Sequence, residues 1–266
     1  MKSMTVSLLS RLSGLSPQTI RNYADLGLIE VQEDVSNGYR YFSASSINQT
    51  YAVRRLSELG FPILDIQEIM GSVTSERYEA MFDALARQTQ EEIAYRQDVL
   101  SMIRIHQESL TGFRTRLNAG RIIPGEAFYC LDYAVNDETL LSDAAPLVRQ
   151  WIPHAAFVRI YSPFPVQALH AGAPDKVIGF IIPEQFSRHF PLDAPVYRRS
   201  AARYAVFPIK NDDHMTILNG GREHVLRFLE ENHLTIAGEP FFIGNIPFFE
   251  EEQKVFFATL YIPIEP

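Results

Sequence analysis

The chain has 266 residues, more than a single hydrophobic core usually serves, so two or three structural units are expected. Hydrophobic residues make up 46% and charged residues 21% of the sequence, which argues against disorder or a collagen-like repeat. The formal net charge of −8, taken alone, argues against a nucleic-acid partner, because phosphates bind clustered lysine and arginine. Residues 1–71, however, carry six basic and seven acidic side chains, and most of the excess acidity follows residue 120.

Neither a secretory leader nor a membrane span is indicated, because no charged leader precedes an apolar run and no stretch of 18 apolar residues occurs. A cytoplasmic protein without a membrane partner is therefore expected. Cys130 is the only cysteine, which excludes an internal disulfide and argues against a thiolate metal site. Its apolar neighbours predict a buried structural thiol. No metal, cofactor or catalytic residue is predicted.

Two short helices are predicted at the start of the chain. Apolar residues at helical spacing follow Thr5, and Gly14 is suited to end that helix. Ser16 and Pro17 then provide an N-cap and a first helical residue for a second helix that ends before Gly27. Two short helices joined by a tight turn form a helix-turn-helix, whose second helix normally enters the DNA major groove. A solvated helical hairpin is the alternative for this segment taken alone.

A hairpin and two more helices are predicted next. Asn37-Gly38 is a strong hairpin turn, and the aromatic run 39–42 suits its second strand. Ser43 is suited to cap a helix that ends at Gly60, and Phe61-Pro62 introduces a short helix that reaches Met70. The hairpin and the helix pair are predicted to be two wings beside the reading helix.

The N-terminal region resembles the MerR family of transcription regulators through residues 16–23, Gly27-Leu28-Ile29, residues 37–42 and Leu59-Gly60-Phe61. Asn22 and Ala24 depart from the family pattern, which usually has an aromatic and an acidic residue there. The resemblance implies binding to double-stranded promoter DNA, and most contacts are expected to be to phosphates. The residues expected at the DNA are Ser16, Gln18, Thr19, Arg21, Asn22, Tyr23, Tyr39, Arg40, Tyr41, Arg54 and Arg55.

A long helix is predicted from Ser75 to about Asn118, because Gly112 is the only glycine or proline in this stretch. At ~1.5 Å per residue it would span about 60 Å, a length suited to a coiled coil, so we expect a homodimer. By resemblance, the two helices pair antiparallel. His106 is interpreted as a packed polar residue. The heptad positions of the expected seam, most of them apolar, are Tyr78, Phe82, Leu85, Thr89, Glu92, Arg96, Val99, Ile103, His106, Leu110, Phe113 and Leu117.

Beyond Arg121 the pattern strand, helix, strand, strand occurs twice. The first unit combines strands 127–135, 156–161 and 176–182 with a helix 138–151. The second combines strands 202–209, 240–249 and 254–263 with a helix 215–233. We expect an α+β arrangement, an antiparallel sheet with both helices on one face and a ligand groove between the halves. The predicted domains are thus a winged helix-turn-helix (1–71), a coiled-coil dimerisation helix (72–120) and a ligand-binding domain (121–266).

The C-terminal half is similar to the GyrI-like effector domain of multidrug-sensing regulators of the BmrR type, through residues 202–206, 238–241 and 260–264. The resemblance implies a small lipophilic or aromatic ligand held by aromatic rings, with cations favoured by a buried carboxylate. Thr259 and Ile243 stand where that family often has glutamate, so the ligand is expected to be neutral, or cationic and held by ring faces. Asp132 and Glu184 are the alternative counter-charges. The expected ligand contacts are Tyr129, Tyr133, Trp151, Tyr161, Phe164, Tyr204, Phe241, Phe248, Phe256 and Tyr261.

The function expected from these features is a ligand-responsive activator that remodels promoter DNA for RNA polymerase as a homodimer. A regulator of a specific metabolite and an effector domain with residual hydrolase activity are the alternatives. The histidines and carboxylates of the C-terminal half show neither Ser-His-Asp spacing nor a zinc signature, so no enzyme is expected. A metal or redox sensor is disfavoured by the single cysteine.

Overall fold

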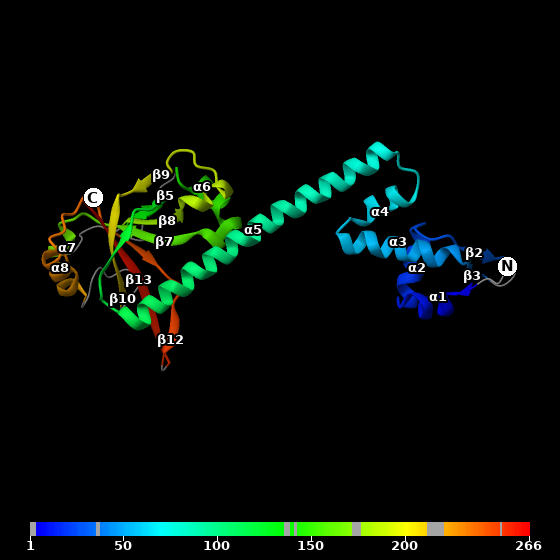
Figure 1. Ribbon diagram of the computed structural model, residues 1–266, viewed down its shortest axis with the longest axis horizontal. Coiled ribbons are helices and arrows are strands. Elements are labelled where there is room, and N and C mark those ends of the chain that lie inside the picture. Colours follow the sequence, from blue (N-terminus) through cyan, green and yellow to red (C-terminus); the bar gives the residue numbers. More distant parts are fainter. Residues whose placement is uncertain are drawn as a thin grey trace. The chain divides into compact units, whose positions relative to one another are not determined.

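The chain is seen in Figure 1 as a computed structural model. The structure describes residues 4–35, 38–135, 139–140, 143–171, 177–211, 221–250 and 252–266. They form two compact units, Met1–Ala94 and Tyr95–Pro266, and the division falls inside the long helix α5 (Ser75–Arg116). Within the described ranges, no helix is long and apolar enough to cross a membrane.

The first unit opens with strand β1 (Met4–Thr5), helix α1 (Val6–Ser13) and helix α2 (Pro17–Asp25). The expected caps are confirmed. The Ser16 hydroxyl accepts a hydrogen bond from the backbone N–H of Thr19 at 3.0 Å. Gly14 ends α1 in the left-handed conformation (φ 71°), which its missing side chain permits. The helix-turn-helix predicted from these residues is therefore present.

The hairpin of the first wing consists of β2 (Gln32–Asp34) and β3 (Tyr39–Phe42), and β3 also pairs with β1. Asn37, half of the expected turn, lies outside the described residues. Helices α3 (Ser45–Leu59) and α4 (Ile63–Met70) follow. The expected cap at Ser43 is wrong, because its hydroxyl bonds that of Ser45, and α3 has no side-chain cap.

Two apolar clusters hold the first unit together. Leu9 and Ile20, both 0% exposed, pack with Phe42 of the wing and so fix the helix-turn-helix against the hairpin. The second cluster joins α3 and α4 to Met81, with Phe82 and Leu85 of α5 packed against it. The first turns of α5 are thus part of this unit's core.

The second unit contains an antiparallel sheet whose strand order is β4-β10-β13-β11-β7-β8-β5-β6, with β12 beside β13 and β9 beside β5 (Figure 1). The expected antiparallel sheet domain is confirmed. Its strands are β4 (Arg121–Pro124), β5 (Ala127–Val135), β6 (Thr139–Leu140), β7 (Arg159–Pro163), β8 (Val177–Pro183), β9 (Tyr197–Ser200), β10 (Arg203–Asn211), β11 (Phe241–Gly244), β12 (Phe248–Glu250) and β13 (Gln253–Ile264).

The helices of this sheet domain are short. They are α6 (Ala145–Trp151), η1 (Ile152–Phe157), α7 (Ala168–Ala171), η2 (Glu184–His189) and α8 (Arg222–Glu231). The strand expected at 156–161 begins only at Arg159, because the 3-10 helix η1 extends to Phe157. Parts of the expected helices 138–151 and 215–233 lie outside the described residues.

The two faces of the sheet bury different aromatic sets. Phe242 of β11 shares one face with Phe207 and with Val225 of α8. The neighbouring Phe241 points to the opposite face, where its ring stacks on Tyr261 at a centroid distance of 5.2 Å. The aromatics of that second face cover one another, and the Arg199 guanidinium lies 5.4 Å from the centre of the Phe241 ring.

Helix α5 continues into the second unit, where it packs on the sheet domain of the same chain. Met102 is buried in the cluster around Trp151, and Phe113 packs against Val255 and Phe257 of β13. Near both ends of α5, residues of the expected coiled-coil seam therefore pack against other elements of the same chain. Its polar middle, Thr89 to Arg96, lies between the two packed stretches.

Candidate functional site

The reading helix α2 presents one polar face and buries the other. Gln18, Arg21 and Asn22 are exposed, whereas Ile20 and Ala24 are buried in the core of the first unit. The Gln18 side-chain amide donates to the Asn22 side-chain oxygen at 2.9 Å. Arg21 has no carboxylate partner among the described residues, so its five donors are available to phosphates or base edges.

Three of the predicted DNA-binding residues on α2 also have structural roles. The hydroxyls of Ser16 and Thr19 lie 2.8 Å apart at the N-terminus of the helix, where Ser16 is the cap. Tyr23 is half-buried and packs against both apolar clusters of the unit. These side chains help to fix α2 in the unit, so any contact they make with DNA is in addition to this structural role.

On the first wing, Arg40 is held by two carboxylates. Its guanidinium donates to Asp25 at 2.5 Å and to Glu33 at 3.1 Å. The hydrogen bond that Arg40 donates to Asp25 is the main cause that raises the pKa of Arg40 above its usual value. Tyr39 is 66% exposed, and Tyr41 is half-buried between β1 and β2.

The second wing carries two adjacent arginines in different surroundings. Arg54 donates to Glu58, one turn along α3, at 2.9 Å. Arg55 is exposed, and no described carboxylate pairs with it. Among the predicted DNA-binding arginines, Arg21 and Arg55 therefore form no ion pair with the described residues, whereas Arg40 and Arg54 do.

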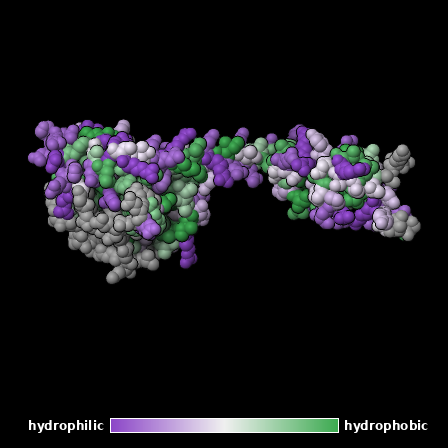
Figure 2. All heavy atoms as spheres, turned by 90° about the horizontal axis from the view of Figure 1, so that it is seen from below, coloured by the Kyte–Doolittle hydropathy of each residue, from purple (hydrophilic) through white to green (hydrophobic). Residues whose placement is uncertain are grey.

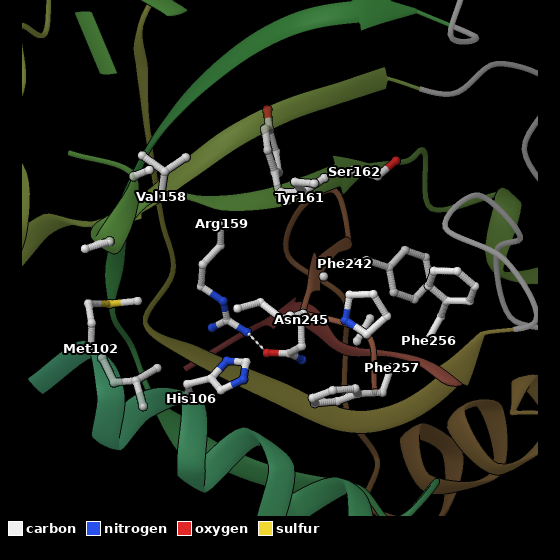
Figure 3. A pocket seen from close by; sticks show the side chains of 18 of the residues that line it. Met102, His106, Val158, Arg159, Tyr161, Ser162, Phe242, Asn245, Phe256 and Phe257 are labelled. Carbon is white, nitrogen blue, oxygen red and sulfur yellow. Dashed lines mark hydrogen bonds between the residues drawn. The ribbon is translucent and has the colours of Figure 1, made fainter. Parts of the chain in front are cut away.

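The second unit contains a cavity of about 900 Å³ between α5, η1 and the strands β7, β11 and β13 (Figure 3). This volume is sufficient for a small organic ligand. Of the ten aromatics expected to contact a ligand, Tyr133, Tyr161 and Phe256 line it. Much of the remaining lining is aliphatic or aromatic, including Met102, Ile103, Val158, Ile160, Phe242 and Phe257.

The other seven expected ligand residues do not line this cavity. Trp151 is 0% exposed, and its indole N–H donates to the backbone oxygen of Pro191 at 3.2 Å. Phe164 stacks on Phe242, with ring centres 4.9 Å apart. Tyr204, Phe241 and Tyr261 belong to the aromatic cluster on the opposite sheet face, and Tyr129 packs beside Trp151. Phe248 lies in β12, and its side chain is outside the description.

Several polar side chains of the cavity were not predicted from the sequence as ligand contacts, among them Arg159, Asn245 and His106. Arg159 starts β7, Asn245 follows β11, and His106 lies on α5. The Arg159 guanidinium donates to Oδ1 of Asn245 at 2.5 Å and points toward His106 in Figure 3. Burial, and then the charge of Arg159, lower the pKa of His106. A charged residue at the start of an apolar strand was the available signal for Arg159.

The two carboxylates expected as alternative counter-charges lie elsewhere. Asp132 accepts hydrogen bonds from the hydroxyls of Tyr161 and Tyr197. Burial raises the pKa of both tyrosines, that of Tyr197 to about 12. Glu184 is on the surface in a two-point pair with Arg198, at 2.6 and 3.1 Å. Neither acid lines the cavity, so neither is placed to neutralise a cation there.

Comparison with known proteins identifies the first unit. A family described as the MerR HTH family regulatory protein matches residues 4–72. A mercuric resistance operon regulatory protein of Bacillus cereus is 37% identical over 60 residues, which are 23% of this chain and 46% of that protein. The transcriptional regulator BrlR of Pseudomonas aeruginosa is 27% identical over 129 residues, 47% of this chain and 48% of that protein. The matched regions thus span about half the length of these relatives.

One solved structure, a cryo-EM structure of an EcmrR–DNA complex, covers 98% of this chain and 99% of that chain, with 14% identity and a TM-score of 0.37. The crystal structure of HiNmlR bound to promoter DNA covers 43% of this chain and 95% of that chain, with 20% identity and a TM-score of 0.33. The family match and the caps and wings of the first unit concern the same residues. The N-terminal unit of this chain therefore carries the helix-turn-helix domain of the MerR family of regulatory proteins.

Proposed function

We propose that the protein is a ligand-responsive transcription regulator, which binds promoter DNA through its first unit and a small aromatic or lipophilic compound in the cavity of its second. One observation carries the proposal. The continuous helix α5 supplies Met81 to the core of the first unit and residues 99, 102, 103, 105, 106 and 107 to the lining of the cavity. The helix behind the DNA-binding domain is thus also a wall of the ligand cavity.

A ligand can shift a conformational equilibrium only by as much as its affinity differs between the two states. Met102 and Ile103 lie on α5, so a compound that fills the cavity contacts this helix directly. We propose that filling the cavity selects one position of α5, and that this position favours a bent or untwisted promoter. Deformation of DNA is a way to activate transcription by RNA polymerase without new base contacts.

Homodimerisation through α5 is part of the proposal. Ile93 is 53% exposed and Leu100 is 46% exposed, and they are seven residues apart along one helical stripe. Apolar side chains are also visible among hydrophilic ones along α5 in Figure 2. A second copy packed antiparallel on this stripe would cover them and would match the symmetry of a palindromic DNA site.

We also propose that the second unit is a duplicated, GyrI-like effector domain. The strand order supports this, because β10-β13-β11 on one side of the sheet centre mirrors β5-β8-β7 on the other. In both triplets, the third strand in sequence lies between the first and the second. The cavity is lined by β7 and β11, the two strands at which the triplets meet.

DNA binding is tested by selecting duplexes from a random-sequence pool with the full chain and measuring their affinity by fluorescence anisotropy. Arg21→Ala and Arg55→Ala are expected to weaken binding. Arg149→Ala, a change to an exposed arginine of α6, is the matched control. Failure to enrich any sequence, or equal effects of all three changes, would contradict the proposed role of the first unit.

Ligand sensing is tested with N-phenyl-1-naphthylamine, a neutral aromatic probe whose fluorescence rises in apolar surroundings. Saturable binding with one site per chain is expected. Ile103→Glu, which places a charge in the cavity wall, should abolish it, whereas Leu64→Glu, on the exposed surface of α4, should not. The domain is proposed to be a sensor and not an enzyme, so compounds that bind should be recovered unchanged. Turnover of a bound model ester would refute that part.

A further inference from the structure

We propose that the ligand of this cavity is an amphipathic anion, whose acidic group is bound by Arg159 and Asn245 and whose apolar body fills the remaining space. The inference rests on the proposed function, in which the cavity binds a small compound. It goes further by assigning the charge of that compound and the side chains that recognise it. A carboxylate, sulfonate or phosphate group supplies the required chemistry.

Arg159 is a cation that lacks a charged partner. Its guanidinium has five N–H donors, and its one hydrogen bond to a described residue goes to the neutral Asn245. It forms no ion pair within the described part of the chain, and the carboxylate of Glu126 acts on it only at longer range. Figure 3 shows the guanidinium between β7 and α5, inside the cavity. Most of its donors are therefore open to a ligand.

Asn245 provides a second donor at the same place. Because arginine can only donate, the Asn245 atom 2.5 Å from Arg159 must be the oxygen, which fixes the orientation of the amide. Its nitrogen Nδ2 is then buried without any hydrogen-bond partner in the structure. The backbone N–H of Asn245 donates to Phe257 at 3.1 Å, which anchors the residue to β13. A buried unpaired donor of this kind calls for an acceptor.

The energetics favour an anion over the other ligand classes. Burial lowers the pKa of Arg159, which is the sign of an incompletely compensated charge. Hydrogen bonds between ionised partners are about twice as strong as neutral ones, so a carboxylate would offset this penalty. The described lining contains no aspartate or glutamate, so a lipophilic cation would meet Arg159 with no counter-charge. The apolar lining then suits the hydrocarbon part of an acid.

The test compares two probes that differ by one acidic group. 8-Anilinonaphthalene-1-sulfonate is N-phenyl-1-naphthylamine with a sulfonate added, and both report binding by fluorescence. With the full chain at pH 7.5, the sulfonate is expected to bind at least tenfold more tightly than the neutral probe and to compete with it for one site. Tetraphenylphosphonium, a lipophilic cation, should displace neither probe at matched concentrations.

Two substitutions assign the preference to named side chains. Arg159→Met should remove the tenfold preference while binding of the neutral probe stays within about twofold. Asn245→Asp should do the same by giving Arg159 a carboxylate of its own. Arg149→Met, on the exposed surface of α6, should leave both affinities unchanged. Circular dichroism is the check that each variant is folded. If Arg159→Met does not fold, Asn245→Asp alone still tests whether the preference for the sulfonate depends on this site.

The outcomes separate this inference from the proposed function. Equal affinity for the two probes, or a sulfonate preference that survives both substitutions, would overturn the anion site and leave an apolar sensor. Tighter binding of tetraphenylphosphonium than of the sulfonate would also overturn it. If neither naphthyl probe binds, the proposed ligand cavity itself fails.

Discussion

Arg40 of the first wing donates to Oδ1 of Asp25, at the end of the reading helix α2, over 2.5 Å. Glu33, on the neighbouring strand of the wing, takes a second hydrogen bond from the same guanidinium at 3.1 Å. The wing and the reading helix are thus joined by a charged contact, and the charge of Arg40 is already offset before any phosphate approaches.

The first prediction concerns the salt dependence of DNA binding. Each phosphate neutralised by a cation adds about 0.9 to the slope of log affinity against log salt. Arg21→Ala and Arg55→Ala should each lower that slope by roughly one. Arg40→Ala should lower it by clearly less, because the Arg40 guanidinium already binds Asp25 and Glu33 and so contributes little to neutralising a phosphate. Anisotropy titrations from 50 to 300 mM salt measure the slopes, and a larger effect at Arg40 than at Arg21 would contradict the prediction.

The second prediction concerns close packing beside the cavity. A Cβ atom at Gly179 of β8 would lie 2.2 Å from the Tyr161 ring and 2.7 Å from the backbone oxygen of Leu131. Gly179→Ala should therefore destabilise the second unit by about 1–3 kcal/mol, the usual cost of overpacking. Gly238→Ala is the control, because its nearest neighbour, Pro263, is 3.6 Å away.

Urea unfolding followed by Trp151 fluorescence measures both variants, since this single tryptophan is buried in the second unit. The unfolding midpoint of Gly179→Ala should fall. That of Gly238→Ala should stay the same or rise slightly. Similar midpoints for the two variants would show that β7 and β8 tolerate a side chain between them.

The third prediction concerns the pH dependence of anion binding. Burial and the charge of Arg159 hold the pKa of His106 below its usual 6.5 in the free protein. An anion beside Arg159 removes part of that repulsion, so the pKa of His106 should rise in the complex. The complex then takes up a proton, and affinity should increase as the pH falls through the range below 6.5.

Arg159 is the charged neighbour of His106 in this lining, and the Phe257 ring lies 6.3 Å from the imidazole. The sulfonate of 8-anilinonaphthalene-1-sulfonate stays ionised throughout, so pH 5.5 to 8 can be scanned without titrating the probe. His106→Gln should flatten the profile. A profile that flattens only with Arg159→Met, or that rises with pH, would exclude His106 as the titrating group.

The fourth prediction concerns self-association through α5. Ile93→Glu combined with Leu100→Glu should convert a dimer to a monomer, because two charges would enter the apolar stripe. Gln90→Glu, at an exposed position on the same helix, is the control. Sedimentation equilibrium gives the mass directly. A wild-type chain that is monomeric at 50 µM would rule out the proposed homodimer at that concentration.

The N-terminal elements could be predicted closely because their signals are local. Ser16, Gly14 and Gly60 act within one turn of the helices they cap or end, and each is found at the expected end. Ser43 failed as a cap because Ser45 competes for its hydroxyl, a contact that no rule of spacing distinguishes.

The ligand site was harder to predict because it depends on contacts distant in sequence. Tyr204 and Phe241 were predicted to contact a ligand, but their rings are buried against each other on one face of the sheet. Arg159 and Asn245 are 86 residues apart, and only the pairing of β7 with β11 brings them together. The seam on α5 was predicted as one interface between two copies, but two of its residues, Phe82 and Phe113, pack within the chain on different units.

Cys130 gives the molecule a practical property. The thiol is 0% exposed, and burial raises its pKa to about 12, so almost no reactive thiolate exists at neutral pH. No other cysteine is present in the sequence. Maleimide reagents should therefore leave the native chain unmodified and label only cysteines introduced on the surface. Pairs of spectroscopic labels can then be attached to either unit without removing a native residue, and distances between them can be followed as DNA or a probe is added.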